Sequence, residues 1–117
     1  MKSFFILTLC LTVTLCANDF NAIVLEQVHA MPSGGGYATT RAAHDALLDS
    51  CAISSAGIRI QATHATPSYC SGATYLVFLK TLLALQSHGK INIGEDAWKA
   101  LMPARLGDGV GVWGRWN

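Results

Sequence analysis

The chain has 117 residues and a formal net charge of +1, which gives enough length for one domain and not for two. Hydrophobic residues make up 51% of it, a composition typical of a globular protein and not of a disordered one. Lysine and arginine form no basic cluster, which argues against nucleic acid as a partner.

The first 17 residues carry the pattern of a secretory signal peptide. A short positively charged start precedes an uncharged, largely apolar run over residues 4–16, which is too short to span a membrane comfortably. Ala17 is a small residue that suits the cut, and a buried N-terminal helix is the alternative interpretation of this run. Lipid attachment at Cys16 is disfavoured because Leu15, and not a small residue, precedes it. We therefore expect a secreted or periplasmic protein that keeps no stable membrane span after signal removal.

Residues 18–36 are expected to form an N-terminal segment and a glycine-rich linker ahead of the domain proper. Residues 18–30 are apolar without clear periodicity, a pattern compatible with a strand or a helix. The three consecutive glycines at 34–36 predict a flexible turn. No P-loop lysine or dinucleotide-binding spacing follows them, so we expect no phosphate site here.

The first part of the remaining domain, residues 37–117, predicts a helix and then a strand. A threonine at residue 39 or 40 can cap a helix that runs to about residue 50. Ala43, Leu47 and Cys51 are spaced four residues apart, which puts Cys51 at the end of the buried face of this helix. Residues 57–62 alternate between apolar and polar side chains, which predicts a short, half-buried strand.

The strongest pattern is an apolar helix over residues 73–85. Only three polar residues interrupt it, so we expect a central helix buried on nearly all sides. Ser68 or Ser71 can cap its start, and Gly89 is a natural stop.

A shorter helix is expected next, with acidic residues in its first turn and Trp98 on its apolar side. The glycine- and tryptophan-rich residues 107–117 that follow predict an active-site loop or a strand entering a sheet.

Cys70 stands at the start of the apolar helix, where a nucleophile would be placed well. Unpaired N–H groups and the positive end of the helix dipole stabilise a thiolate there. Small residues follow it, so a substrate can approach closely, and the N–H of Cys70 can help to bind an oxyanion.

A cysteine nucleophile needs a general base, which is usually histidine. His88 lies 18 residues beyond Cys70 on the same helix, roughly 27 Å away at 1.5 Å per residue, and is excluded. His64 lies six residues upstream and can fold back, so it is the candidate base. His44 is expected to be solvated, and the sequence does not decide the role of His29.

The segment PSYCSGATYLVFL, residues 67–79, resembles the nucleophile segment of papain-like cysteine hydrolases of the NlpC/P60 and CHAP kind. Together with DGVGVWGRWN, residues 108–117, it is similar to a group of exported bacterial proteins of that superfamily, and the resemblance covers residues 34–117. It implies an α+β fold in which a buried helix bearing the nucleophile, Cys70, packs on an antiparallel sheet. It also implies an amide bond as substrate, in a peptide or a peptidoglycan-like polymer.

The sequence departs from the pattern of this superfamily in one respect. The resemblance calls for a histidine on a strand after the cysteine helix, followed by a polar residue that orients it. No histidine follows His88, and most of the sheet is missing. We therefore expect the helix-rich N-terminal half of a papain-like domain, either part of a longer hydrolase or an inactive fragment. Ser71, Asp108 and Asn117 are the residues expected at the oxyanion site and the cleft.

Two other roles for Cys70 stay open on the sequence alone. A disulfide with Cys51 would close a loop of 18 intervening residues, worth about 3 kcal/mol in the chain-entropy model, and would make the protein a non-enzymatic exported binding domain. Cys70 can also simply fill the core. The histidines lack metal-binding spacing, so we expect neither a metal nor another cofactor. The sequence does not indicate an oligomeric state.

Overall fold

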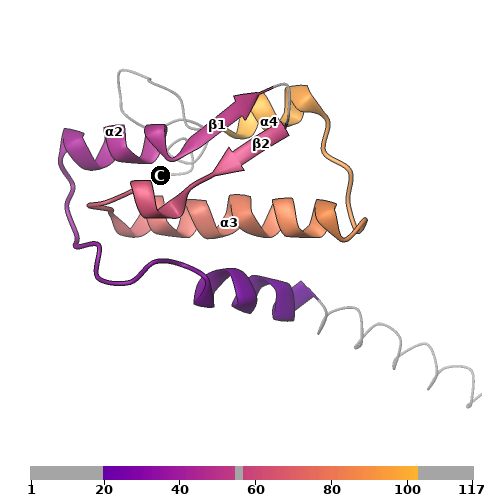
Figure 1. The fold of residues 1–117 in the computed structure, drawn as a ribbon, viewed down its shortest axis with the longest axis horizontal. Helices are drawn as coiled ribbons and strands as arrows, with labels where there is room; N and C mark the ends of the chain where they lie inside the picture. The colour runs from indigo at the N-terminus through magenta and orange to yellow at the C-terminus, as the bar shows by residue number, and fades with distance from the viewer. Residues whose placement is uncertain (1–19, 55–56, 103–117) are drawn as a thin grey trace, which may run out of the picture.

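The computed structural model describes residues 20–54 and 57–102. A helix over residues 20–29 comes first. The elements that follow are α2 (Arg41–Asp49), β1 (Cys51–Ser54), β2 (Gly57–Ile60), the short 3-10 helix η1 (Ala62–His64), α3 (Cys70–Ser87) and α4 (Glu95–Leu101) (Figure 1). The protein is therefore a small α+β domain, as the sequence predicts. The expected signal peptide, residues 1–17, and the tail over residues 107–117 lie outside the described residues.

Helix α2 begins where the sequence predicts, because Thr40 caps it. The Thr40 hydroxyl accepts a hydrogen bond from the N–H of Ala43 at 3.4 Å, and Thr40 itself has extended backbone angles. Ala43 and Leu47 are buried on the inner face, also as predicted.

The prediction that Cys51 ends the buried face of α2 is wrong, because Cys51 is the first residue of β1. The chain turns at Ser50, which is almost fully buried. The Ser50 hydroxyl donates to the Leu47 carbonyl at 2.7 Å, and the Ser50 carbonyl accepts the N–H of Gln61 at 2.7 Å. The second bond ties the end of α2 to the residue after β2, so the chain continues as a strand and not as a helix.

Strands β1 and β2 form a two-stranded antiparallel sheet in which Cys51 pairs with Ile60 and Ser54 with Gly57. The predicted strand over residues 57–62 is thereby confirmed, although it ends at Ile60. Ile58 and Ile60 are half-buried and alternate with exposed neighbours, which is the expected pattern for a strand with one covered face. β1 was not predicted.

Helix α3 starts three residues earlier than predicted, at Cys70. Its N-cap residue is Tyr69, and neither of the two predicted serine caps forms. The Ser68 hydroxyl instead donates to the carbonyl of Tyr69 at 3.4 Å, and Ser71 lies within the first turn. The first turn of α3 is therefore left without a capping side chain.

The predicted stop of α3 at Gly89 is confirmed and has a clear physical cause. Gly89 has φ of +67°, a left-handed conformation that costs glycine little. Its N–H donates to the carbonyl of Gln86, and the N–H of Lys90 donates to that of Leu85, both at 2.9 Å. This pair of bonds is the Schellman arrangement, which satisfies the last carbonyl groups of the helix.

Helix α3 is the central element, with α2 and the hairpin on one side and the helix over residues 20–29 on the other (Figure 1). Leu76 and Leu79 have at most 1% of their surface exposed. They pack in one buried cluster with Leu47, Ala65, Tyr75 and Trp98. Burial extends around most of residues 73–85, as expected, except along one strip where Thr74 and Phe78 are exposed.

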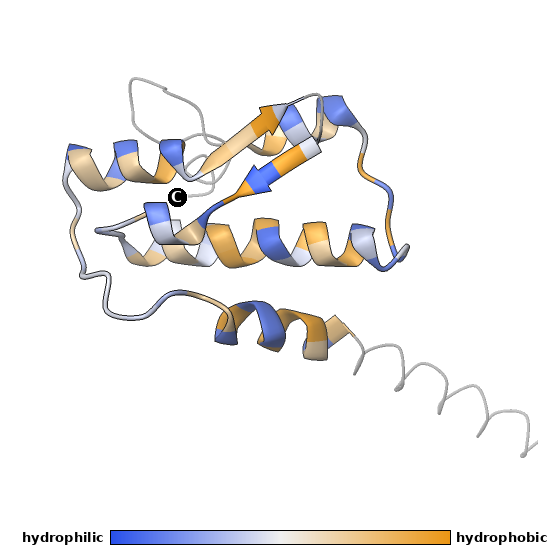
Figure 2. Ribbon diagram, in the orientation of Figure 1, coloured by the Kyte–Doolittle hydropathy of each residue, from blue (hydrophilic) through white to orange (hydrophobic). Residues whose placement is uncertain are grey.

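Two further elements lie against α3. Hydrophobic residues lie along the helix over residues 20–29 (Figure 2), where Ile23 is buried and Leu25 is exposed. The Lys80 ammonium of α3 donates to the carbonyl of Ala30 at 3.2 Å, just after this helix. On the opposite side, α4 starts with two acidic residues and buries Trp98, as predicted.

No helix in the part of the chain that the structure describes is long and apolar enough to cross a membrane.

The central packing of α3 predicts the effect of truncating Leu79, which has no exposed surface. Leu79→Ala should lower the free energy of unfolding by about 2–5 kcal/mol, because it leaves a cavity where the structure cannot relax fully. Leu82→Ala is the matched control, since Leu82 is only half-buried on the same helix, and it should cost clearly less. Urea unfolding followed by circular dichroism measures both variants, and equal losses would contradict the packing described.

Candidate functional site

The candidate site is the start of α3, and the glycine-rich segment fixes the approach to it. The N–H of Ala38 donates to the carbonyl of Ser68 at 3.0 Å, and the N–H of Ser68 donates to the carbonyl of Gly36 at 3.2 Å. Gly36 has φ of +77° and so favours glycine. The segment expected to be a flexible linker thus pairs with the chain two residues before Cys70.

Cys70 itself is exposed and occupies the first position of α3. The N–H groups of a first helical turn have no partner within the helix, and here no side chain caps them. The carbonyl of Cys70 accepts the hydroxyl of Thr74 at 2.9 Å. The thiol therefore stands at the start of an 18-residue helix whose first turn has no capping side chain.

The ring of Tyr69 lies against the first turn of α3 and was not recognised from the sequence. An atom added as Cβ on Gly72 would lie 3.2 Å from a ring carbon of Tyr69 and 3.5 Å from the hydroxyl oxygen of Ser68. Glycine at residue 72 therefore lets the ring lie close to the helix. Partial burial raises the pKa of Tyr69 above its ordinary value.

Cys51 is half-buried and has a different environment from Cys70. Burial raises the pKa of the Cys51 thiol, and the hydroxyl of Ser50, 3.5 Å from its sulfur, offsets only part of that rise. Both cysteines are free thiols, so the disulfide considered above is not formed in this structure.

Tyr75 is buried one helical turn inside the site and joins α3 to α4. Its hydroxyl donates to the carbonyl of Leu101. Burial raises its pKa strongly, and the nearby ionisable groups of Cys51 and Tyr69 raise it further. The buried side of the site is thus neutral and protonated, and of the two cysteines that the structure describes, Cys70 is the exposed one.

The structure does not bring the predicted base to the nucleophile. His64 is the last residue of η1 and is exposed, and no hydrogen bond joins it to Cys70 within residues 20–54 and 57–102. His88 follows the far end of α3, as expected from the helix length. His44 is more covered than predicted, with its ring 21% exposed and Nδ1 3.9 Å from a carboxylate oxygen of Asp45. His29 is exposed.

The other predicted site residues divide between described and undescribed parts of the chain. Ser71 is half-buried next to Cys70. Asp108 and Asn117 lie outside the described residues. Among the residues that are placed, no three histidine, cysteine, aspartate or glutamate side chains gather in a way that could hold a metal ion.

Comparison with known proteins adds no relative from which the site could be interpreted. No family model, curated protein or solved structure matches the chain.

The contrast between the two thiols predicts a difference in alkylation rate. At neutral pH, Cys70 should react with iodoacetamide roughly tenfold or more faster than Cys51, because only thiolate reacts and burial disfavours the thiolate of Cys51. Mass spectrometry of tryptic peptides gives the two rates separately, because cleavage after Arg59 places Cys51 and Cys70 in different peptides. Equal rates, or a faster Cys51, would contradict this assignment.

The raised pKa values also predict weaker stability at high pH. In the unfolded chain a thiol ionises near 9.0 and a phenol near 10.0, whereas the folded protein holds both protons to higher pH. This contribution to stability is complete below the unfolded values and is lost as pH rises through and above them. The free energy of unfolding should therefore fall above pH 9.0.

Tyr75→Phe should make this fall less steep, whereas Tyr37→Phe, which alters a tyrosine that is 70% exposed, should leave it unchanged. Urea unfolding at a series of pH values measures the slopes. Identical slopes in all three proteins would show that Tyr75 is not the group responsible.

Proposed function

We propose that this chain is the nucleophile-bearing part of an exported cysteine hydrolase that cleaves an amide bond, with the helix-rich half of a papain-like fold. The observation that carries the proposal is the exposed thiol of Cys70 at the uncapped first turn of α3. Export rests on the signal-like pattern of residues 1–17. The alternative, a binding domain stapled through Cys51 and Cys70, needs a bond that this structure does not contain.

The proposed reaction uses the groups at the start of α3 in two steps. The Cys70 thiolate attacks the carbonyl carbon of the substrate, and N–H groups of the first turn stabilise the oxyanion that forms. The carbon–nitrogen bond then breaks and the amine leaves with a proton, so that an acyl group stays on sulfur. Water attacks this thioester, which releases the carboxylic acid and restores the thiol.

His64 is the proposed base within this chain. It lies shortly before residues 66–70, which lead into α3. Its ring is exposed and therefore free of packing that would hold it in place. A base must come within about 2.6–3.2 Å of the proton it takes, although this distance is often longer without substrate. The proposal therefore requires that His64 approach Cys70 when substrate binds, or that the base lie outside the described residues.

The surface beside Cys70 suits an extended peptide. Tyr37 is 70% exposed and pairs in a parallel bridge with Ser68, two residues before the nucleophile. The ring of Tyr69 lies against Gly72 in the first turn of α3. Aromatic rings bury substrate surface at small entropic cost, so these two tyrosines could hold a peptide or a peptidoglycan-like chain across the thiol.

Hydrolysis of cell-wall peptides tests the proposal directly. Release of new amino groups from purified peptidoglycan peptides should be lost in Cys70→Ser and kept in Cys51→Ser. If His64 is the base, His64→Ala should lower the rate by about 10²- to 10⁴-fold, the usual contribution of general base catalysis. His88→Ala is its matched control and should have no effect, because His88 lies at the far end of α3.

Two outcomes would count against parts of this proposal. Hydrolysis that survives in Cys70→Ser removes Cys70 as the nucleophile. Hydrolysis that depends on Cys70 but not on His64 keeps the nucleophile and assigns the base to another residue.

A further inference from the structure

Residues 36–38 form a short extended stretch that lies beside the approach to Cys70. Tyr37 and Ser68 form a parallel bridge. Its two hydrogen bonds use the N–H of Ala38, which donates to Ser68 at 3.0 Å, and the carbonyl of Gly36, which accepts from Ser68 at 3.2 Å. Both bonds therefore come from the neighbours of Tyr37 and neither comes from Tyr37 itself. In a bridge of this kind the N–H and the carbonyl of Tyr37 point away from Ser68.

These two main-chain groups of Tyr37 have no partner in the described structure. Within residues 20–54 and 57–102, neither group makes a hydrogen bond, and Tyr37 is 70% exposed. A Cβ added to the adjacent Gly36 would meet nothing within 4 Å, its two chain neighbours aside. The outer edge of residues 36–38 is therefore an unpaired strand edge that no side chain crowds next to Tyr37.

The chemistry of this edge fits one kind of partner. A donor and an acceptor on the same residue are the groups through which a strand pairs with a neighbouring chain, and an extended peptide offers the matching acceptor and donor from one of its own residues. The pair reads the main chain of the peptide, because side chains stand above and below the plane of the bonds. The hydroxyl groups of a sugar match this pair less well.

The position of the edge relates it to the candidate nucleophile. Tyr69 has an extended backbone, so the chain runs extended from Ser68 to Cys70. Neighbouring strands lie about 4.8 Å apart and advance about 3.3 Å per residue, which places a peptide residue paired with Tyr37 roughly 12 Å from Cys70. Three or four extended residues span this distance.

We propose that this edge binds the main chain of the substrate peptide, with the N–H and the carbonyl of Tyr37 each forming a hydrogen bond to one peptide residue, a few residues from the bond that Cys70 attacks. This inference rests on the proposed function and deepens it, because it names main-chain pairing as the means by which the substrate is held. The contacts are non-covalent, so binding itself makes and breaks no covalent bond.

Amide hydrogen exchange at Tyr37 tests the proposal. The full chain with Cys70→Ser is labelled with ¹⁵N on tyrosine only, which gives three amide signals, and that of Tyr37 is the one lost in Tyr37→Phe. The probe is the set of peptides cut from purified peptidoglycan. At saturation the Tyr37 amide should exchange with water at least about tenfold more slowly, because a hydrogen bond protects it. The amide of Tyr75, inside α3, is the internal reference and should not change.

Two variants separate the main chain of Tyr37 from its ring. Tyr37→Ala removes the ring and keeps the N–H, whereas Tyr37→Pro removes both. Tyr37→Pro should bind the peptides about fivefold more weakly than Tyr37→Ala, the equivalent of one hydrogen bond. If Tyr37→Pro does not fold, the exchange measurement decides, because it leaves residue 37 unaltered.

Three results would overturn the proposal. They are an unchanged exchange rate at Tyr37, equal binding by Tyr37→Ala and Tyr37→Pro, and an equal slowing by glycan strands that carry no peptide. Its failure can be told apart from that of the hydrolase. A slowed Tyr37 amide in a protein that hydrolyses nothing keeps the peptide edge and removes the hydrolase, whereas hydrolysis with an unchanged Tyr37 amide does the reverse.

Discussion

The burial of one face of α3 is the constraint on which the rest of the structure depends. Leu76 and Leu79 are the most deeply buried residues of the helix, and α2, the hairpin and α4 each contribute side chains to the cluster around them. Because the centre of the helix is fixed in this way, its two ends are held at the edge of the domain. One end presents Cys70 to solvent, and the other is closed by Gly89. The exposed thiol and the glycine that ends the helix thus lie at opposite ends of one element.

The same constraint gives two cysteines opposite properties. Cys51 follows α2 into a strand that packs on the cluster, so burial raises the pKa of its thiol and keeps it protonated. Cys70 is the first residue of α3 and directly follows Tyr69, which has an extended backbone. No side chain caps the helix there, and Cys70 is exposed. Residue type alone does not distinguish a reactive thiol from an inert one, and position relative to the buried face does.

The sequence predicted the elements whose signals are local. Thr40 caps α2 and Gly89 ends α3 as expected, and the expected apolar run lies within α3, although the helix begins three residues earlier. β1 could not be predicted, because four residues without clear alternation become a strand only by pairing with β2. The role of Cys51 was missed for a related reason. The helical spacing of apolar residues does not reveal that the Ser50 carbonyl will accept the N–H of Gln61, which redirects the chain into a strand.

The parts of the candidate site that the sequence did not reveal all depend on contacts between segments. Tyr69 lies against Gly72 only because the first turn is already formed, and the glycine-rich segment is fixed only by its bonds to residue 68.

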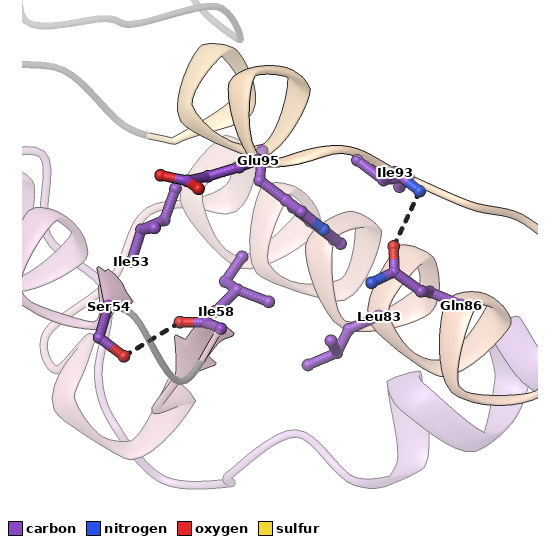
Figure 3. Close-up of a pocket in the computed structure, with 9 residues that line it drawn as sticks. Ile53, Ser54, Ile58, Leu83, Gln86, Ile93 and Glu95 are labelled. Atoms are coloured by element: carbon purple, nitrogen blue, oxygen red, sulfur yellow. Dashed lines mark hydrogen bonds between the residues drawn. The ribbon is translucent and has the colours of Figure 1, made fainter.

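The same holds for the pocket lined by Ile53, Leu83 and Trp98, whose walls come from the hairpin, α3 and α4 (Figure 3). Two hydrogen bonds anchor the α4 region to α3, one from the Tyr75 hydroxyl to Leu101 and one from the N–H of Ile93 to Gln86. They lie at opposite ends of the segment that contains Trp98. Trp98 is therefore held in place from both sides.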